Sequence, residues 1–191
     1  MSNSTTDYSS ILLFVGTNTG RFSTFKVLPE AHGGYTVQPA GTANLEDQVI
    51  SISPLIADSG KPAYASQQAY SSLRQDFRFN GVVLVVTITG VRLFKPAASK
   101  GASKSWSEFF CDAASVVRSI DGAVALVGLF GDGNTRTFSI PGLKEISCTK
   151  IESADPRRFP EAIISSSGAI FGWTGPSEIA VLNPWGSGQD M

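Results

Sequence analysis

Val127-Gly-Leu-Phe-Gly-Asp-Gly-Asn-Thr-Arg-Thr-Phe-Ser-Ile140 is the stretch of sequence that decides the fold. An apolar run leads into a tight turn through Gly131-Asp-Gly-Asn134, and a second run returns from that turn. Glycine in such a turn supplies a positive φ at low steric cost, and Asp and Asn also tolerate a left-handed backbone. The stretch therefore predicts a β-hairpin.

The same hairpin pattern occurs at three other places, in residues 14–27, 85–95 and 170–182. The turn glycines of the four hairpins are Gly20, Gly90, Gly133 and Gly175. The last two intervals between these glycines are 43 and 42 residues, and the first is 70. A period of about 40–45 residues is typical of the four-stranded blades of a β-propeller. The longer first interval then contains one blade plus an insertion, which we place at residues 57–80.

The rest of the chain is typical of an all-β protein. Its apolar segments are short, rich in β-branched and aromatic residues, and separated by Gly, Asn, Asp and Pro. No long segment has the 3.6-residue period of an amphipathic helix. Strands are predicted at 11–16, 21–28, 35–39, 49–55, 81–87, 91–95, 115–119, 123–130, 135–140, 145–150, 162–165, 169–173 and 178–182.

These strands group into WD40-like β-propeller blades. Two blades are complete, at 49–109 and 115–150, and partial blades flank them at 11–39 and 162–182. In the first three hairpins, the turn glycine is soon followed by an arginine where the strand leaves the core and then by an aromatic residue predicted to pack between blades. The arginines are Arg21, Arg92 and Arg136, and the aromatic residues are Phe25, Phe94 and Phe138.

The number of blades predicts an incomplete propeller. Propellers usually close with four to eight blades, and an unclosed stack exposes the apolar faces of its end blades to water. We therefore expect a part of a longer propeller protein, or a product that needs a neighbour. Within the chain, blades are expected over 11–185, between a disordered segment at 1–10 and a tail at 186–191.

Composition lowers the expectation for several classes of partner. Fifteen basic residues balance sixteen acidic ones, so no overall field attracts nucleic acid or anionic lipid. No apolar run approaches the roughly 18 residues of a membrane span, and the polar N-terminus lacks the layout of a signal peptide. Cys111 and Cys148 occur in strand-like segments without a CxxC spacing, which predicts two buried reduced thiols in a cytoplasmic protein.

No group of residues predicts catalysis, a cofactor, a metal or a small-molecule substrate. His32 is the only histidine, and its Pro-Glu-Ala-His-Gly-Gly context predicts an exposed turn. The segment 16–24 looks like a phosphate loop but lacks the Gly-Lys-Ser/Thr ending, and 131–134 offers too few oxygen ligands for calcium. The alternative of a propeller-fold hydrolase, such as a glycosidase, is disfavoured because no acid pair accompanies the 119–122 segment.

Two segments are candidates for partner binding. The insertion at 57–80 carries residue types favoured at binding hot spots, namely Tyr64, Tyr70, Arg74, Phe77 and Arg78. It is equally predicted to pack on its own propeller as a cover.

The second candidate is a flexible loop at 95–105 with three lysines, Lys95, Lys100 and Lys104. Neighbouring serines offer phosphorylation sites that would reverse its charge. It is a candidate for contact with acidic lipid or protein, although a plain solvated loop is the simpler interpretation.

Two long stretches, 128–146 and 172–185, resemble the C-terminal propeller of the lethal giant larvae and tomosyn family, above all its fungal exocytosis branch. Segments 14–28, 82–95 and 106–110 agree, so that the resemblance covers about residues 11–185. The chain departs from the family pattern in lacking the first propeller, the regulatory tail, and any Gly-His or Trp-Asp dipeptide.

The resemblance implies a non-catalytic scaffold that regulates SNARE-dependent exocytosis and polarised secretion. Family members are similar in having two seven-bladed propellers and a tail, of which this chain matches the last blades of the second. The implied partners are a plasma-membrane Q-SNARE (SNAP-25-like or syntaxin-like), a secretory Rab GTPase and exocyst subunits. The implied location is the cytoplasm, with peripheral association with plasma membrane or secretory vesicles. A truncated fragment without independent binding is the remaining alternative.

Overall fold

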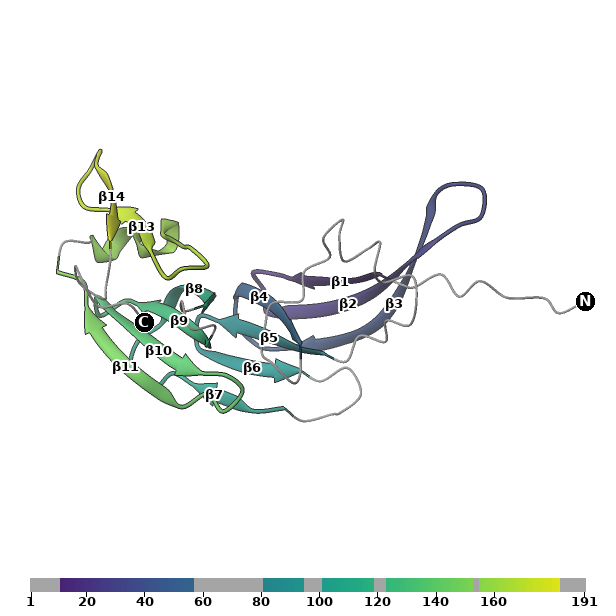
Figure 1. The fold of residues 1–191 in the computed structure, drawn as a ribbon, viewed down its shortest axis with the longest axis horizontal. Coiled ribbons are helices and arrows are strands. Elements are labelled where there is room, and N and C mark those ends of the chain that lie inside the picture. The colour runs from purple at the N-terminus through teal and green to yellow at the C-terminus, as the bar shows by residue number, and fades with distance from the viewer. Residues whose placement is uncertain (1–10, 57–80, 95–100, 119–122, 153–154, 183–191) are drawn as a thin grey trace, which may run out of the picture.

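The structure, a computed structural model, describes residues 11–56, 81–94, 101–118, 123–152 and 155–182 (Figure 1). Within these ranges the chain forms β-strands and one 3₁₀ helix. The elements in chain order are β1 (Ile11–Gly16), β2 (Arg21–Pro29), β3 (Tyr35–Asn44), β4 (Val49–Ile56), β5 (Gly81–Thr87), β6 (Gly90–Phe94), β7 (Ser103–Ser105), β8 (Cys111–Arg118), β9 (Val124–Phe130), β10 (Asn134–Ser139), β11 (Glu145–Lys150), η2 (Pro156–Glu161), β12 (Ile163–Ile164), β13 (Ile170–Trp173) and β14 (Ile179–Leu182).

The strands form four antiparallel sheets in which each strand pairs with the next one along the chain. The sheet orders are β1-β2-β3, β4-β5-β6-β7, β8-β9-β10-β11 and β12-β13-β14. Two four-stranded sheets thus stand where complete blades are predicted, and three-stranded sheets flank them. This confirms the all-β class and the partial WD40-like propeller. The sheets follow one another in an open arc, with β1–β3 at one end and β12–β14 at the other (Figure 1).

Backbone hydrogen bonds that recur from sheet to sheet identify the equivalent strands. In three sheets, the residue after the outer strand donates its N–H to the turn of the central hairpin. These bonds are Leu45 to Gly20 at 2.8 Å, Trp106 to Thr89 at 2.8 Å and Ile151 to Gly133 at 2.9 Å. Strands β3, β7 and β11 are therefore equivalent outer strands, and β4, β8 and β12 are inner strands that contact one another in turn. By this equivalence, the described residues supply no inner strand to the first sheet and no outer strand to the last.

The core lies between the sheets in three clusters, and strand β5 shows why the sequence there is continuously apolar. Every residue of β5 is buried. Because side chains alternate across a strand, Leu84 and Val86 face the third sheet, whereas Val83 and Val85 face the first. Burial on both faces removes the polar alternation of a half-exposed strand. A third cluster, with Leu129 and Ile170, joins the third sheet to the last.

The aromatic residues that follow the hairpin turns have different environments. Phe94 stacks on Phe22 of the neighbouring sheet with ring centroids 5.0 Å apart, and Phe138 is buried beside Trp106, as predicted. Phe25 instead pairs with Leu13, on the face of the first sheet that points away from the stack.

The reason for the turn glycines needs a correction. Gly20 and Gly133 have φ values of 81° and 83°, which confirms the predicted turns. Gly90 is not a turn residue, because it begins β6, and its φ lies outside the left-handed region, as does that of Gly175. A Cβ at position 90 would lie 2.8 Å from the carbonyl oxygen of Lys104. Glycine is required there by the close approach of β7.

Several strand boundaries also differ from the prediction. Strand β3 continues to Asn44, because a register shift leaves Ala40 unpaired between Pro39 and Gly41, and the ladder resumes beyond it. Strand β8 begins at Cys111, four residues early. Strand β7 occupies part of the loop predicted at 95–105, of which 95–100 lie outside the described residues.

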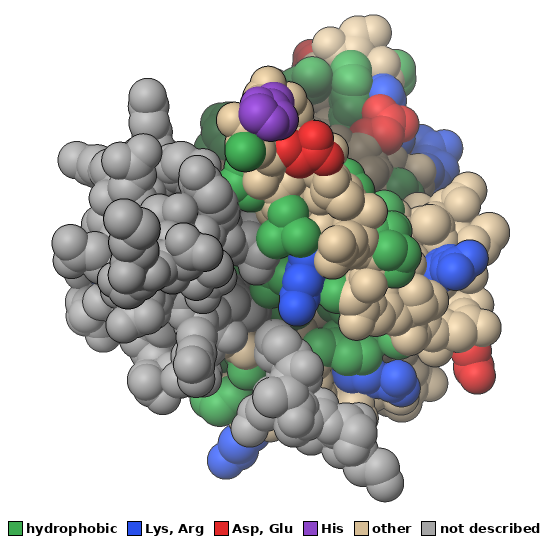
Figure 2. Space-filling view, turned by 90° about the vertical axis from the view of Figure 1, so that its right-hand side faces the viewer, with side chains coloured by type: hydrophobic (Ala, Val, Ile, Leu, Met, Phe, Trp, Pro, Cys, Tyr) green, Lys and Arg blue, Asp and Glu red, His purple; other side chains and the backbone are tan. Residues whose placement is uncertain are grey.

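The two end sheets each turn an apolar face away from the stack. In the last sheet, Ile163, Phe171 and Val181 form one row across three strands, with Ile179 beside them. Ile163, Ile179 and Val181 are 67%, 63% and 62% exposed. The first sheet exposes Leu13, and Figure 2 shows apolar side chains at the surface of that end of the molecule. These faces match the prediction for an unclosed stack.

Candidate functional site

The candidate site is the end of the sheets at which the connecting loops meet the central hairpins, which we call the loop rim. It consists of the loops 45–48 and 106–110, residues 151–152 and 155–162 of the third connection, and the hairpin turns 17–20, 88–89 and 131–133. Each connecting loop lies against the sheet that follows it. Loops held by a rigid scaffold are where binding residues most often occur.

Equivalent bonds fix the first two connecting loops to the next sheet. The Ile88 N–H donates to the Gln48 carbonyl at 3.1 Å, and the Gly131 N–H donates to the Phe110 carbonyl at the same distance. At the first junction the Thr89 hydroxyl also donates to the Asp47 carboxylate. The rim is thus a hydrogen-bonded structure in which the side chains have defined positions.

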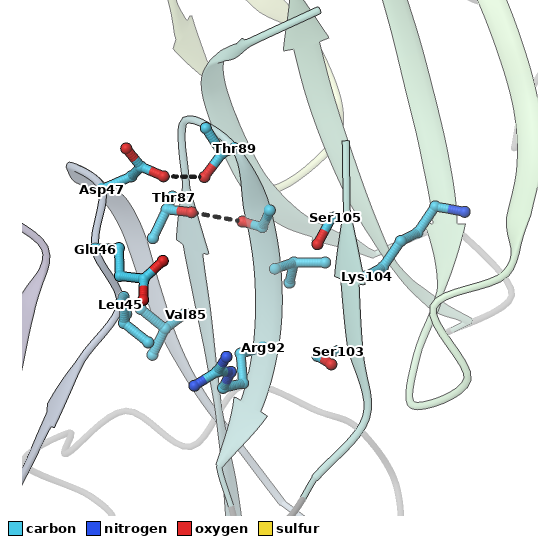
Figure 3. Close-up of a pocket in the computed structure, with 12 residues that line it drawn as sticks. Leu45, Glu46, Asp47, Val85, Thr87, Thr89, Arg92, Ser103, Lys104 and Ser105 are labelled. Atoms are coloured by element: carbon cyan, nitrogen blue, oxygen red, sulfur yellow. Dashed lines mark hydrogen bonds between the residues drawn. The ribbon is translucent and has the colours of Figure 1, made fainter. Parts of the chain in front are cut away.

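A polar pocket of about 170 Å³ lies at the junction of the first and second sheets (Figure 3). Glu46 and Asp47 of the connecting loop line one side, and Arg92, Ser103 and Ser105 of the second sheet line the other. Glu46 has a φ of 72°, unusual for a residue with a side chain. Its N–H donates to the Asn44 side chain at 3.1 Å, which helps to hold this turn.

An aromatic pocket of about 270 Å³ lies at the junction of the second and third sheets. The Trp106 ring lies 5.2 Å from Phe130 in an edge-on arrangement and 5.1 Å from Phe138. Lys104 Nζ lies 5.3 Å from the centre of the Phe138 ring, within cation–π range. Phe109, 43% exposed, lines the mouth. Glu108 and Glu145 also line this pocket, so it offers a partner aromatic surface together with charges of both signs.

The Asp132–Arg136 pair supports the wall of the aromatic pocket. Two Arg136 nitrogens donate to the two Asp132 oxygens at 3.2 and 2.6 Å, and the guanidinium lies 4.6 Å from the centre of the Phe130 ring. Partial burial acts to raise the pKa of Asp132, but hydrogen bonds from Arg136 and Asn134 outweigh it and lower that pKa. The carboxylate in the 131–134 turn is therefore occupied by its own sheet.

The third junction is closed by η2. The Asp155 carboxylate accepts the Arg157 N–H at 3.1 Å at the start of this helix. Arg158 lies 3.6 Å from the centre of the Trp173 ring and pairs with Glu161. These contacts cover the third junction between sheets, whereas the first and second junctions have pockets.

The structure places only part of the predicted site. Tyr64, Tyr70, Arg74, Phe77 and Arg78 lie outside the described residues, as do Lys95 and Lys100, so their role stays a prediction. Lys104 is in β7 and lines both pockets. Arg92 and Phe109 line the rim pockets, although neither was predicted as a site residue. The aromatic run at 106–110 was the signal for the second of them.

The two cysteines and the histidine lie outside the loop rim. Cys111 is buried as predicted, and burial followed by the charge of Asp112 raises its pKa to about 12. Cys148 is exposed, so the prediction of a buried thiol is wrong for it. It lies in the outer strand β11, in which no residue is fully buried. Apolar residues nearby in the sequence therefore do not show that Cys148 is buried. His32 lies in the β2–β3 turn.

Among the described residues, no three His, Cys, Asp or Glu side chains gather in a way that could hold a metal ion. In the same part of the chain, no helix has the length and apolar character needed to cross a membrane.

Comparison with known proteins identifies relatives along the whole chain. Residues 1–191 match the family described as "Lethal giant larvae (Lgl) like, C-terminal". The chain is 26% identical over 196 residues to the "Lethal(2) giant larvae protein homolog SRO77" of Saccharomyces cerevisiae. The match covers 96% of this chain and 19% of the yeast protein, so the chain spans about a fifth of the length of that relative.

Proposed function

The chain belongs to the lethal giant larvae-like family of C-terminal regions, and from this membership we propose that it is a non-catalytic protein-interaction scaffold that regulates exocytosis. The observation that carries the proposal is the family match over residues 1–191. The proposed partners are a plasma-membrane Q-SNARE, a secretory Rab GTPase and exocyst subunits. The proposed location is cytoplasmic, with peripheral association with plasma membrane or secretory vesicles.

The geometry of the loop rim is consistent with a scaffold. Its two pockets lie at junctions between sheets, and backbone hydrogen bonds hold the loops that contribute to their walls. Aromatic residues and arginine are favoured at protein interfaces; Arg92 lines the polar pocket, and Trp106, Phe109 and Arg136 line the aromatic one. The perturbed carboxylate Asp132 is engaged by Arg136 in a structural ion pair.

Direct binding to a purified Q-SNARE tests the proposal. The 191-residue chain and a full-length relative, such as the yeast homolog, are immobilised side by side and exposed to SNAP-25-like and syntaxin-like proteins. Saturable binding to the 191-residue chain supports a partner site within it. Binding by the relative alone makes this segment scaffold without independent binding. Failure of both to bind any Q-SNARE, Rab or exocyst subunit overturns the proposal.

A further inference from the structure

Strand β7 ends the second sheet with an unpaired edge. Among the described residues, β7 pairs with β6 on one side only, in the register Gly90–Ser105, Val91–Lys104 and Arg92–Ser103. An edge strand presents a row of N–H and C=O groups to which another extended chain can bond. Here Ser103 and Ser105 are exposed, and neither a charge nor a proline at these positions blocks approach.

The direction of the backbone groups follows from the bonds that β7 already makes. The Ala102 carbonyl accepts the Leu93 N–H at 2.8 Å, and the Trp106 N–H donates to the Thr89 carbonyl at 2.8 Å. The backbone groups of Ala102 and Trp106 therefore point toward the β6 side of β7. Bonded residues alternate along an antiparallel strand. The backbone N–H and C=O of Ser103 and Ser105 therefore face away from β6. These four groups lie at the open edge.

The two rim pockets lie on opposite faces of the sheet at this edge. Ser103 and Ser105 line the polar pocket, whereas the Lys104 side chain points away from it, toward the third sheet (Figure 3). Lys104 lies over Phe138, at the aromatic pocket lined by Trp106. A strand added to β7 would direct its successive side chains to these two faces in turn.

We propose that the open edge of β7, with the polar pocket on one face and the aromatic pocket on the other, binds an extended peptide segment of a partner protein. The peptide continues the β4–β7 ladder as a further strand, bonding to the backbone of Ser103 and Ser105. An apolar or aromatic side chain of the peptide enters the pocket of Trp106 and Phe109. The next side chain, which is polar, faces the hydroxyl groups and Arg92 on the other face.

The observations favour a strand over other ligands. In strand addition, backbone bonds supply affinity and pockets for alternate side chains supply specificity. The rim has both features within one three-residue strand. A small ligand in either pocket would leave the outward backbone groups of β7 unused. The inference rests on the proposed function only in treating the chain as an interaction module, and it holds for any partner identity.

Selection from a display library of random seven-residue peptides on the 191-residue chain tests the inference. We expect enriched peptides with an apolar or aromatic residue next to a polar one, measured afterwards by fluorescence anisotropy. Ser105→Pro removes an outward N–H without breaking a β6–β7 bond, since proline is tolerated at edge positions whose N–H faces solvent. It should weaken binding at least tenfold. Ser105→Ala keeps the backbone N–H and removes only the hydroxyl group, so it should weaken binding clearly less than Ser105→Pro does.

A second matched pair tests the aromatic pocket. Phe109→Ala should weaken binding at least fivefold, and Phe110→Ala should not, because Phe110 is 61% exposed and lines neither pocket. No enrichment of peptides, or binding that Ser105→Pro leaves intact, overturns the inference; the second result indicates an apolar end face as the binding surface. Where Ser105→Pro leaves binding of the selected peptides intact while the chain still binds a Q-SNARE, the inference fails and the proposed function stands.

Discussion

Cys111 and Cys148 lie in strand-like sequence of the same kind, yet the fold gives them opposite chemistry. Cys111 begins the inner strand β8 and is fully buried, and burial raises its pKa to about 12. Cys148 lies on the outer strand β11 and is exposed. The thiolate is the reactive form of cysteine. We therefore expect the exposed Cys148 of the outer strand to react and the buried Cys111 of the inner strand not to react.

We expect one rapidly reacting thiol per chain with an aromatic disulfide reagent at pH 8. Because burial raises the pKa of Cys111 to about 12, its thiol stays protonated at pH 8. Cys148→Ser should abolish the fast reaction, and urea should release a second thiol in the wild type. Two fast thiols in the folded chain would show that Cys111 is accessible.

The ion pair of Asp132 with Arg136 makes a pH-dependent contribution to the stability of the fold. Its side chain is 11% exposed and that of Arg136 is 19% exposed, so solvent screens the pair only partly. Asp132→Asn should lower the free energy of unfolding by about 1–2 kcal/mol at pH 7, measured by urea denaturation. Glu161, which forms an exposed ion pair with Arg158, provides the control. Glu161→Gln should cause no measurable change in the free energy of unfolding.

The sign of the pH effect follows from the lowered pKa of Asp132. A carboxyl whose folded pKa is depressed stabilises the protein above its unfolded pKa. The ordinary value is 3.8. The difference between wild type and Asp132→Asn should therefore stay constant from pH 7 to about pH 4. It should then shrink as the pH falls through the lower folded pKa. A difference that grows on acidification would contradict this assignment.

At the scale of elements, the β6–β7 pair depends on one close approach of two backbones. Gly90→Ala would place a Cβ 2.8 Å from the Lys104 carbonyl oxygen. We expect β7 to be displaced and the chain destabilised by about 1–3 kcal/mol, as for other overpacked sites. Hydrogen exchange should report faster exchange at the Trp106 and Leu93 amides. The control Gly41→Ala has open space around its Cβ and should leave both amides protected.

At the scale of the whole molecule, the open stack predicts self-association. The row formed by Ile163, Phe171 and Val181 lies on a face that no described sheet covers. Such a face favours contact with another apolar surface. The sedimentation coefficient of the chain should therefore rise with concentration. The double substitution Ile163→Thr and Val181→Thr keeps β-branched residues in the strands and should reduce the association constant at least tenfold.

A matched control distinguishes an end face from general surface hydrophobicity. Ile146 is as exposed as Ile179 but lies on the outer strand β11. Ile146→Thr should leave the association constant within twofold of wild type. A wild-type chain that sediments as a monomer at all concentrations would show that these faces do not attract each other.

The sequence alone predicted the fold to the level of blades. The hairpins repeat at a nearly constant spacing, and a blade is a local structure whose strands pair in chain order. Both complete sheets and both partial ones occur where the repeat placed them. Short-range pairing of this kind is encoded by turn residues and apolar runs, and both can be identified from sequence.

Only the tertiary structure decided which residues meet across sheets. Lys104 was predicted in a loop, but it lies in β7 between two pockets whose walls come from three sheets. Gly90 fits no turn rule, because its constraint is a carbonyl group brought close by β7. Cys148 was misplaced because burial in a propeller depends on whether a strand is inner or outer. These properties depend on residues distant in sequence, so local pattern does not contain them.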